Sequence, residues 1–486
     1  AASPTEVVQP AARPLGVDGA RAFILASPVL LPLVGTPLDA PSWRAKEVGD
    51  GNINFVYIIE GPLGAVCLKQ ALPFVRCVGD SWPLSQDRMR IEATVLARHG
   101  HLCPEHVPRT FQYLPKQSLL AMEFLAPPAA ILRVRLVEGK TFPKLGKQVA
   151  TYLAATLFHT SHLALPGAVF KEQVRQFTNP EMCALTEQVI FLEPFQGRAA
   201  GNNHWTTPYL DAEVDRLAKD TAAAAAALEA KRVFCGQPEA LLHGDLHTGS
   251  LMVSDDRMWA LDPEFAFVGP IGFDVAKILG NLIMALLAVP GLASQQGKEE
   301  EGSEEAKEIG QKENNQIDRE KQATWLAECV VEIWEEFEAK FKALWTDSIS
   351  NKTQGKDEDD KKDDKKEPAL YPEALVCKQV EDGEEEKEIL LETVQNAYLK
   401  RVFKDTVQFM GTVLIRRVIG IAHVQDMKTI QRDDVRSQCE AAAIRIGRKW
   451  LVQAKEEAEK GIRSIVKDAQ DEAGKAKEAI RIILAK

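Results

Sequence analysis

Short apolar runs in the first third of the chain predict a small antiparallel sheet. These runs are rich in β-branched and aromatic residues, are separated by glycine turns, and lie at residues 54–60, 65–70 and 118–122. Between the second and third runs, residues 86–99 carry apolar side chains at helical spacing. We therefore predict a β-rich lobe with a single helix packed on it.

Helical periodicity dominates the chain after Pro127 and Pro128. It is clearest at residues 147–162 and 211–231, the latter containing an alanine run of high helix propensity. Short apolar runs at residues 240–242, 251–253 and 259–261 predict a β-hairpin and a neighbouring strand within the helical part. The fold class expected is therefore α+β, with a small antiparallel β lobe and a larger helical lobe.

Two stretches without an apolar face interrupt the helical lobe and are expected to be solvated surface insertions. The segment between them keeps an apolar stripe from Ala323 to Trp345 and is expected to pack on the lobe. The organisation predicted is an N-terminal extension at 1–42, a nucleotide-binding lobe at 43–125, a catalytic and substrate-binding lobe at 126–452 with charged insertions at 296–321 and 351–367, and a charged helical tail at 453–486.

Composition narrows the classes of function. The net charge of -11 disfavours a protein that grips nucleic acid or an anionic membrane, because either task needs a basic face. The eight cysteines are scattered without a C-x-x-C pair, which indicates reduced thiols in a cytoplasmic setting. The longest apolar stretch, residues 278–289, is shorter than the roughly 20 residues that span a bilayer. We expect a cytoplasmic protein with no membrane or nucleic-acid partner.

A glycine-containing turn at residues 47–57 leads into the first predicted strand. Gly51 and Asn52 would let the backbone approach a triphosphate, whereas Asn54 stands where a kinase has its third glycine. Lys69 ends the next strand, from which a kinase lysine reaches the nucleotide phosphates, and Glu92 on the following helix is its expected ion-pair partner. Taken alone, the turn is more typical of a structural hairpin and each charged residue of a surface charge, and only their order favours a nucleotide site.

The end of the third strand is expected to form the connection between the lobes. Glu123, Phe124 and Leu125 lie there, just before the two prolines, where backbone groups could hydrogen-bond to adenine.

The most specific pattern is Leu241 to Ser250, followed by Leu261 to Phe265. Asp245 could orient an attacking hydroxyl and accept its proton, while Asp262 and Glu264 could hold the magnesium that bridges phosphate oxygens. If this segment is extended, two carboxylates two residues apart point to the same side. His243 and His247 raise zinc as an alternative, although no third sulfur or nitrogen ligand stands nearby, and an ordinary acidic loop is the remaining alternative.

These motifs resemble the methylthioribose kinase family, which is related to the aminoglycoside and choline kinases and has a bilobal protein-kinase-like fold. The resemblance lies in residues 243–250 (HGDLHTGS) and 262–274 (DPEFAFVGPIGFD). It extends to shorter stretches around Gly51, Lys69, Trp82, Leu185, Trp205 and Ile415, and it covers about residues 43–452 apart from the two insertions.

The resemblance implies roles for particular residues. It places Asn54, Lys69 and residues 123–125 at ATP, and Asp262, Pro263 and Glu264 at ATP and Mg²⁺. It also implies that Asp245 contacts the sugar and that Arg416 or Arg417 contacts substrate and opposes the charge of the transferred phosphoryl group. From their own pattern, adjacent arginines would be interpreted as helix-surface charges, because successive helical residues diverge by roughly 100°.

The function expected from the resemblance is ATP-dependent phosphorylation of 5-methylthioribose at its anomeric hydroxyl, in methionine salvage, by a homodimer. Two alternatives remain open at this point: a kinase for another small alcohol, of the aminoglycoside or choline type, and a catalytically inactive scaffold that binds partners through its insertions.

Overall fold

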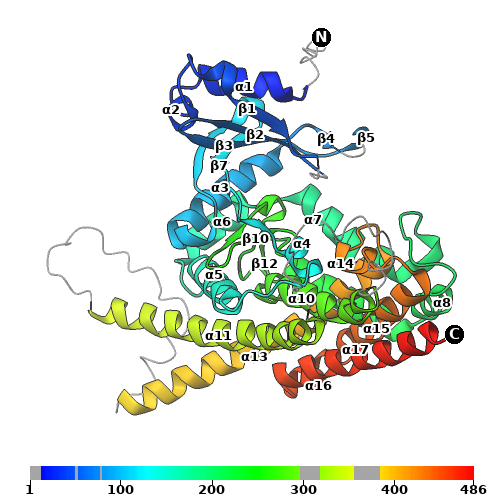
Figure 1. Ribbon diagram of the computed structural model, residues 1–486. Coiled ribbons are helices and arrows are strands. Elements are labelled where there is room, and N and C mark those ends of the chain that lie inside the picture. Colours follow the sequence, from blue (N-terminus) through cyan, green and yellow to red (C-terminus); the bar gives the residue numbers. More distant parts are fainter. Residues whose placement is uncertain (1–12, 50–52, 77–78, 296–317, 355–383) are drawn as a thin grey trace, which may run out of the picture. The chain divides into compact units, whose positions relative to one another are not determined.

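The computed structural model describes residues 13–49, 53–76, 79–295, 318–354 and 384–486 (Figure 1). The chain divides into two compact units. Unit 1 comprises the chain up to Pro127 together with Pro263–Phe265, and unit 2 comprises Pro128–Asp262 and Ala266–Lys486. Residues 296–317 of the first expected insertion and 355–367 of the second lie outside the described residues.

Unit 1 is built on a five-stranded antiparallel sheet of order β1-β2-β3-β7-β6 (Figure 1). Its register places Lys69 opposite Val56 on one neighbouring strand and Leu120 on the other. A separate two-stranded ribbon joins β4 and β5. The strands are β1 (Arg44–Glu47), β2 (Phe55–Gly61), β3 (Gly64–Gln70), β4 (Phe74–Val75), β5 (Gly79–Pro83), β6 (Thr110–Leu114) and β7 (Leu119–Glu123).

Helices cover both faces of this sheet. Because side chains alternate along a strand, Tyr57, Ile59 and Leu68 face one side, where they pack with helices α1 (Gly16–Ala26) and α2 (Leu31–Val34). Lys69 faces the other side, toward helix α3 (Asp87–Leu102). The segment before Trp43, set apart in the sequence as an extension, thus contributes to the same core as the sheet from residue 16 onward.

Unit 2 is mainly helical, with two small sheets. Strands β8 (Ala130–Ile131), β10 (Leu251–Val253) and β11 (Met258–Ala260) form one sheet, and β9 (Ala240–Leu241) pairs with β12 (Val268–Gly269). The helices are α4 (Leu132–Val137), α5 (Leu145–His159), α6 (Gly167–Gln176), α7 (Pro180–Thr186), α8 (Asp211–Ala218), α9 (Thr221–Gly236), α10 (Ile271–Ala293), α11 (Arg319–Gln354), α13 (Glu384–Ile419), α14 (Gln425–Lys428), α15 (Asp433–Val452), α16 (Ala454–Glu459) and α17 (Ile462–Leu484).

The single helix expected at residues 211–231 is two helices, α8 and α9. The break falls at Asp220, whose side chain accepts a hydrogen bond from the backbone N–H of Ala223 at 3.0 Å. This N-cap satisfies an amide that has no partner within the helix and fixes the start of α9. Helical spacing predicts the helical conformation on both sides of Asp220, but it does not reveal the break that this capping residue makes.

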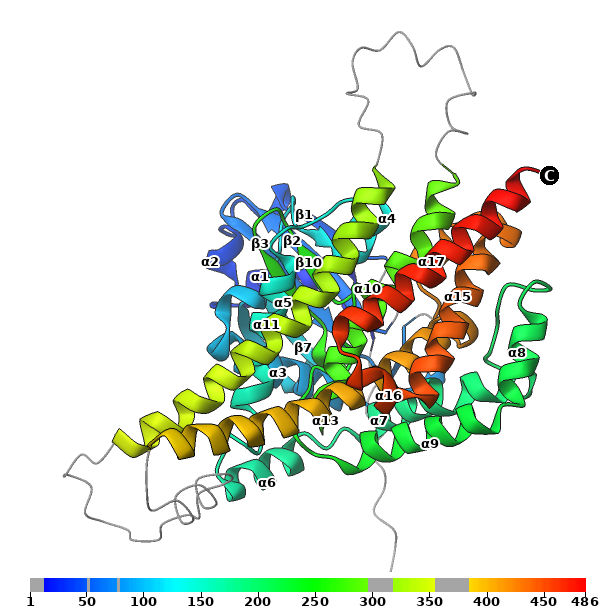
Figure 2. The same cartoon turned by 90° about the horizontal axis from the view of Figure 1, so that it is seen from below.

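Helix α10 is the central helix of unit 2. It packs against α11, α13, α15 and α17, and Figure 2 shows α17 lying across α10 and α15. At 23 residues with a mean hydropathy of 1.9 in its most apolar window, α10 is long and apolar enough to cross a membrane, but that window is entirely buried within unit 2. It is therefore a core helix, longer than the apolar run that predicted it.

The last residues of the first expected insertion, from 319 on, and the charged C-terminal tail belong to packed helices. Arg319, inside the first expected insertion, begins α11, is buried, and donates a hydrogen bond to the carbonyl of Val137 at 2.8 Å. The C-terminal tail forms α16 and α17, and α17 buries one apolar stripe, which includes Ile465, Val466 and Ile480. The charged side chains of α17 lie outside its buried apolar stripe, as in an amphipathic helix, whereas Arg319 is buried.

Candidate active site

In unit 1, Lys69 and Glu92 form a buried ion pair. The Nζ atom of Lys69 lies 2.8 Å from Oε1 of Glu92, and the two side chains are 4% and 0% exposed. β3 supplies the lysine and the face of α3 that packs on the sheet supplies the glutamate. The structure thus brings together the two residues that the sequence order suggested. The pair fixes the lysine ammonium at a defined place on the sheet.

Asn54 and Glu264 contact each other in unit 1, and Arg88, which the sequence analysis missed, contacts both. The Asn54 amide donates to Oε2 of Glu264 at 2.8 Å, and Nε of Arg88 donates to the Asn54 carbonyl oxygen at 3.1 Å. Arg88 is fully buried, and its Nε also lies 3.4 Å from Glu264 Oε2. The Asn54 side chain and the Glu264 carboxylate are therefore both engaged within the protein.

The other expected nucleotide contacts are partly described. Glu123 ends β7, and its carboxylate accepts a hydrogen bond from the backbone N–H of Arg109 at 3.1 Å. Phe124 is half-buried and Leu125 is buried, and both directly precede the boundary between the two units at Pro127. Gly51 and Asn52 lie outside the described residues.

In unit 2, the loop that carries Asp245 is fixed by hydrogen bonds along its length. Asp274, in the first turn of α10, accepts from the backbone N–H groups of His243 and Gly244 at 2.6 and 2.9 Å. The hydroxyl of Ser250 donates to the carbonyl of Asp245 at 2.8 Å. Gly244 has φ of +82°, a conformation that glycine adopts without strain. The short motif after β9 therefore holds a single conformation.

Both histidines of the motif take part in this loop. His243 Nε2 donates to the carbonyl of Leu261 at 2.7 Å, and His247 Nδ1 accepts from the backbone N–H of Gly249 at 3.0 Å. Burial lowers the pKa of His247 to about 3, so its ring is neutral and its Nε2 carries the hydrogen that faces Asp245 Oδ2 at 3.3 Å. These bonds occupy the ring nitrogens that a zinc site would need.

Asp245 lies among buried cations. Its Oδ1 forms an ion pair with Nζ of Lys277, and its side chain is 22% exposed. Burial raises the pKa of Asp245, but the attraction of Lys277 and Arg416 and the hydrogen bond from His247 outweigh burial and hold the pKa well below its usual range. Asp245 is therefore ionised at neutral pH.

Arg416 and Arg417 lie in the last turn of α13 and are buried, with 8% and 5% of their surface exposed. Nε of Arg416, and Nε and Nη2 of Arg417, have no hydrogen-bond partner among the described residues. Burial, the adjacent Arg416 and then Arg133 lower the pKa of Arg417. The expectation of surface charges from helical spacing is wrong, because α13 is enclosed at this end. Two buried guanidinium groups with unused donors form a site that favours an anion.

Asp262 and Glu264 do not form the extended pair expected from their spacing. Pro263–Phe265 is a turn of 3-10 helix, Asp262 is exposed and Glu264 is buried. Asp262 has φ of +62°, in the left-handed region that is uncommon for residues other than glycine and asparagine. Such backbone conformations cluster at functional sites. Asp262 thus differs from Glu264 both in its backbone conformation and in being exposed.

The residues that sequence reasoning missed are Arg88, Arg133, Asp274 and Lys277. Arg133 donates to Thr248 Oγ1 at 3.1 Å and to Asn281 Oδ1 at 3.0 Å, and it lies 3.5 Å from Asp426. A signal for part of this group was present, because Asp274, Lys277 and Asn281 interrupt an apolar run at helical spacing. Arg88 and Arg133 have no comparable signal, since each is an ordinary charge in its local sequence.

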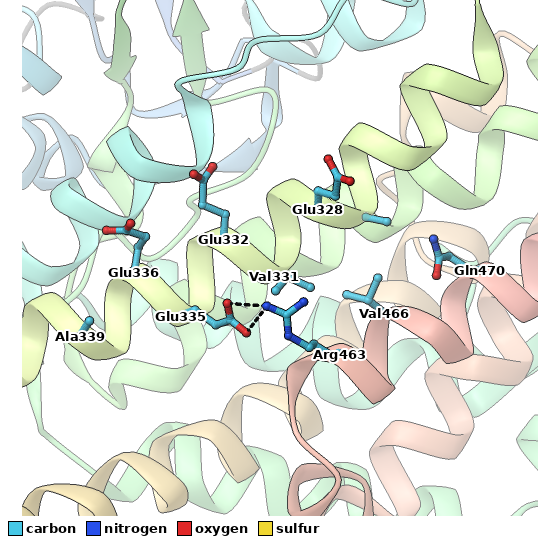
Figure 3. A pocket seen from close by; sticks show the side chains of 10 residues that line it. Glu328, Val331, Glu332, Glu335, Glu336, Ala339, Arg463, Val466 and Gln470 are labelled. Atoms are coloured by element: carbon cyan, nitrogen blue, oxygen red, sulfur yellow. Dashed lines mark hydrogen bonds and ion pairs between the residues drawn. The ribbon is translucent and has the colours of Figure 1, made fainter.

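A separate groove of about 570 Å³ lies between α11 and α17 (Figure 3). It is lined by Glu328, Glu332, Glu335 and Glu336 on one side and by Arg463 on the other, and Arg463 pairs with Glu335 at 2.9 Å. Among the described residues no group of three or more His, Cys, Asp or Glu side chains could hold a metal ion, here or elsewhere. Arg463 and Glu335 are exposed and paired with each other, unlike the buried cations around Asp245.

Comparison with known proteins defines the class first. The sequence profile described as "Phosphotransferase enzyme family" matches residues 44–309, just over half of the chain. The fold, an antiparallel sheet followed by a mostly helical unit, agrees with this class of protein-kinase-like phosphotransferases.

Curated relatives then give the particular family. Methylthioribose kinase 1 of Oryza sativa subsp. japonica is 37% identical over 433 residues, which cover 89% of this chain and 90% of the relative. Methylthioribose kinase of Escherichia coli O45:K1 is 34% identical over 85% of this chain and 88% of the relative. A solved choline/ethanolamine kinase family protein from Mesorhizobium loti has 14% identity and a TM-score of 0.36, with 82% of this chain and 98% of that chain covered. On its curated relatives, this chain belongs to the methylthioribose kinase family.

Proposed function

We propose that this protein transfers the γ-phosphate of ATP to the anomeric hydroxyl of 5-methylthioribose, giving 5-methylthioribose 1-phosphate. The observation that carries the proposal is the ionised Asp245 beside buried arginines with unused donors. Phosphoryl transfer needs these two things on the acceptor side: a carboxylate for the hydroxyl and fixed positive charge for the phosphoryl oxygens. Relatives named methylthioribose kinase, which match most of the chain, support this choice of acceptor.

Unit 1 would supply the donor side. Lys69, fixed by Glu92, would contact the nucleotide phosphates, and the backbone at residues 123–125 would hold the adenine. Asp262, the last residue of the first segment of unit 2, has carboxylate oxygens that fit Mg²⁺, a hard cation that prefers such ligands, and the ion would neutralise charge on the phosphates. Glu264 already shares its charge with Arg88, so we assign it a supporting role rather than that of the main ligand.

The chemical step then assigns one task to each group of unit 2. The substrate hydroxyl donates a hydrogen bond to Asp245, and its oxygen attacks the γ-phosphorus as the bond to ADP breaks. The hydroxyl proton passes to the Asp245 carboxylate. Arg416 and Arg417 direct their unused N–H groups toward the developing negative charge, in a buried setting where such contacts are stronger than in water.

The same proposal includes the wider setting implied by the family resemblance. The reaction would be a step of methionine salvage, carried out in the cytoplasm by a homodimer. Light scattering on the purified protein would test the dimer directly.

A substrate panel tests the proposed function. The full-length protein, with ATP and Mg²⁺, would be assayed for transfer to 5-methylthioribose, an aminoglycoside, choline and homoserine, with Asp245→Asn as the inactive control. We expect transfer to 5-methylthioribose to exceed the others by at least about 100-fold in kcat/KM. Transfer to another alcohol would overturn the choice of substrate, and no transfer to any of them would favour the scaffold.

A further inference from the structure

Helix α10 carries a polar stripe on an otherwise apolar surface. Asp274, Lys277 and Asn281 are spaced three and four residues apart, so they share one face of the helix. All three are buried, with 2%, 1% and 1% of their surface exposed. Asp274 binds the backbone of the Asp245 loop, and Asn281 binds Arg133. The whole stripe therefore faces the proposed acceptor site.

The middle residue of the stripe, Lys277, contacts the side chain of Asp245 itself. Its Nζ pairs with Oδ1, while Oδ2 faces His247. An ionised carboxylate has about four lone-pair sites, so these two contacts leave others for a substrate hydroxyl. Lys277 can therefore hold the carboxylate and remain in place when a substrate binds.

A lysine at this position is costly for the fold alone. Burial lowers the pKa of Lys277 to about 7, and the attraction of Asp245 only partly opposes burial, while Arg416 and Arg417 lower the pKa further. For stability alone an apolar side chain would be more favourable at this position, since the buried residues of α10 outside the polar stripe are apolar or glycine. The charge therefore needs a reason other than stability, and its contact with Asp245 suggests one.

We propose that Lys277 is a positioning residue for phosphoryl transfer, whose ammonium group orients the Asp245 carboxylate and keeps it ionised. This inference rests on the proposed function. Lys277 acts through Asp245 and is distinct from Lys69, the lysine that would contact the nucleotide.

The proposal predicts a specific pH dependence. The ammonium form is present below the Lys277 pKa and is lost as the pH rises through about 7, so kcat/KM of the free enzyme should decline on the alkaline side of that value. Bound ATP is anionic and should raise the pKa, so kcat should decline at a higher pH than kcat/KM. The charged and titratable groups around Lys277 are those of the loop, α4, α10, α13 and α14: Asp245, His247, Arg133, Asp274, Arg416, Arg417 and Asp426.

Three lysine variants test the role kinetically. Lys277→Met should lower kcat/KM about 10- to 100-fold and abolish the alkaline decline, because a misplaced carboxylate orients the hydroxyl poorly. Lys277→Arg, which stays charged at all accessible pH, should recover part of the rate and also lack the decline. Lys144→Met is the matched control, since Lys144 pairs with Asp256 on the surface, and it should retain the parental rate and profile. A parental rate and pH profile in Lys277→Met would overturn the proposal.

A measurement without substrate separates this proposal from the proposed function. In protein labelled with ¹³C at lysine Cε, the Lys277 signal should titrate near pH 7, and Asp245→Asn should move the titration to lower pH because the carboxylate stabilises the ammonium. Titration near the ordinary value for lysine, or no change in Asp245→Asn, would reject the pairing even if methylthioribose is the substrate. If Lys277→Met fails to fold, this titration and Lys277→Arg still decide the question.

Discussion

The two units bury charge in different ways. In unit 1 the buried charges are matched: Lys69 with Glu92, and Arg88 with Glu264 and the amide of Asn54. In unit 2 four cations, Arg133, Lys277, Arg416 and Arg417, surround Asp245 and Asp426, and several guanidinium donors have no partner among the described residues. A matched pair fixes a geometry, whereas an unmatched excess of positive charge is stabilised by a ligand. Unit 1 therefore holds its buried charges in fixed pairs, whereas the excess positive charge of unit 2 favours binding of an anion.

The largest effect is expected from removal of the Asp245 carboxylate, which lies among these cations. Asp245→Asn should lower kcat by about two to four orders of magnitude, because an amide cannot accept the hydroxyl proton. The melting temperature should change little, since asparagine preserves the shape of the side chain and Lys277, whose pKa burial lowers to about 7, can lose its charge when the carboxylate is gone. The control is Asp256→Asn, an exposed acid paired with Lys144. Turnover of Asp245→Asn within threefold of the parent would end the assignment.

Variants of Arg416 and Arg417 test whether the excess positive charge stabilises the phosphoryl group during transfer. Arg416→Ala or Arg417→Ala should slow phosphorylation by about 100- to 1,000-fold in at least one case, as expected for the loss of a cation opposite a developing charge. Nucleotide affinity, measured by calorimetry, should be nearly unchanged. Lysine should rescue only part of the rate, since it lacks the planar fork of arginine.

Arg436→Ala is the matched control, because Arg436 lies on α15 and pairs with Asp433. If both alanine variants of the pair keep the parental rate, the unmatched donors have no catalytic role.

The smallest effect on rate, and a large effect on stability, is expected at Glu264. Glu264→Ala leaves Arg88 buried without the Glu264 carboxylate and should destabilise unit 1 by about 3 kcal/mol in urea unfolding.

Asp262→Asn should instead raise the Mg²⁺ concentration needed for activity and leave stability close to that of the parent, because asparagine also adopts the left-handed backbone conformation of Asp262.

Glu60→Ala provides the control for stability, because its partner Arg44 is exposed and such pairs contribute little. An unchanged Mg²⁺ requirement in Asp262→Asn would reject that residue as the metal ligand.

The sequence predicted the fold well where periodicity was strong and unbroken. The sheet of unit 1 and helix α3 follow directly from apolar runs and helical spacing, and the ion pair of Lys69 and Glu92 follows from their order. The expected geometry of Asp262 and Glu264 was wrong, because a proline between them starts a 3-10 turn. The burial of Arg416 and Arg417 was not predictable from α13 alone, since it depends on the segments packed around the end of that helix.

The same limit explains why the sequence predicted only part of the surroundings of Asp245. Lys277 is 32 residues beyond Asp245 in the sequence, and only the packing of α10 against the loop reveals their contact. A polar residue in an apolar run indicates a buried interaction, but it does not identify the partner.

The polar stripe of α10 makes the proposed acceptor site sensitive to helical phase. Inserting one residue between Asp274 and Lys277 would rotate every later residue by about 100° relative to Asp274, which would turn Lys277 away from the loop while Asp274 still held its backbone. An insertion of four residues comes within about 40° of a full turn, but it shifts Lys277 by about 6 Å along the axis. Neither change restores both contacts. The length of this segment is therefore constrained as strictly as the identity of its residues, a constraint that single substitutions would not reveal.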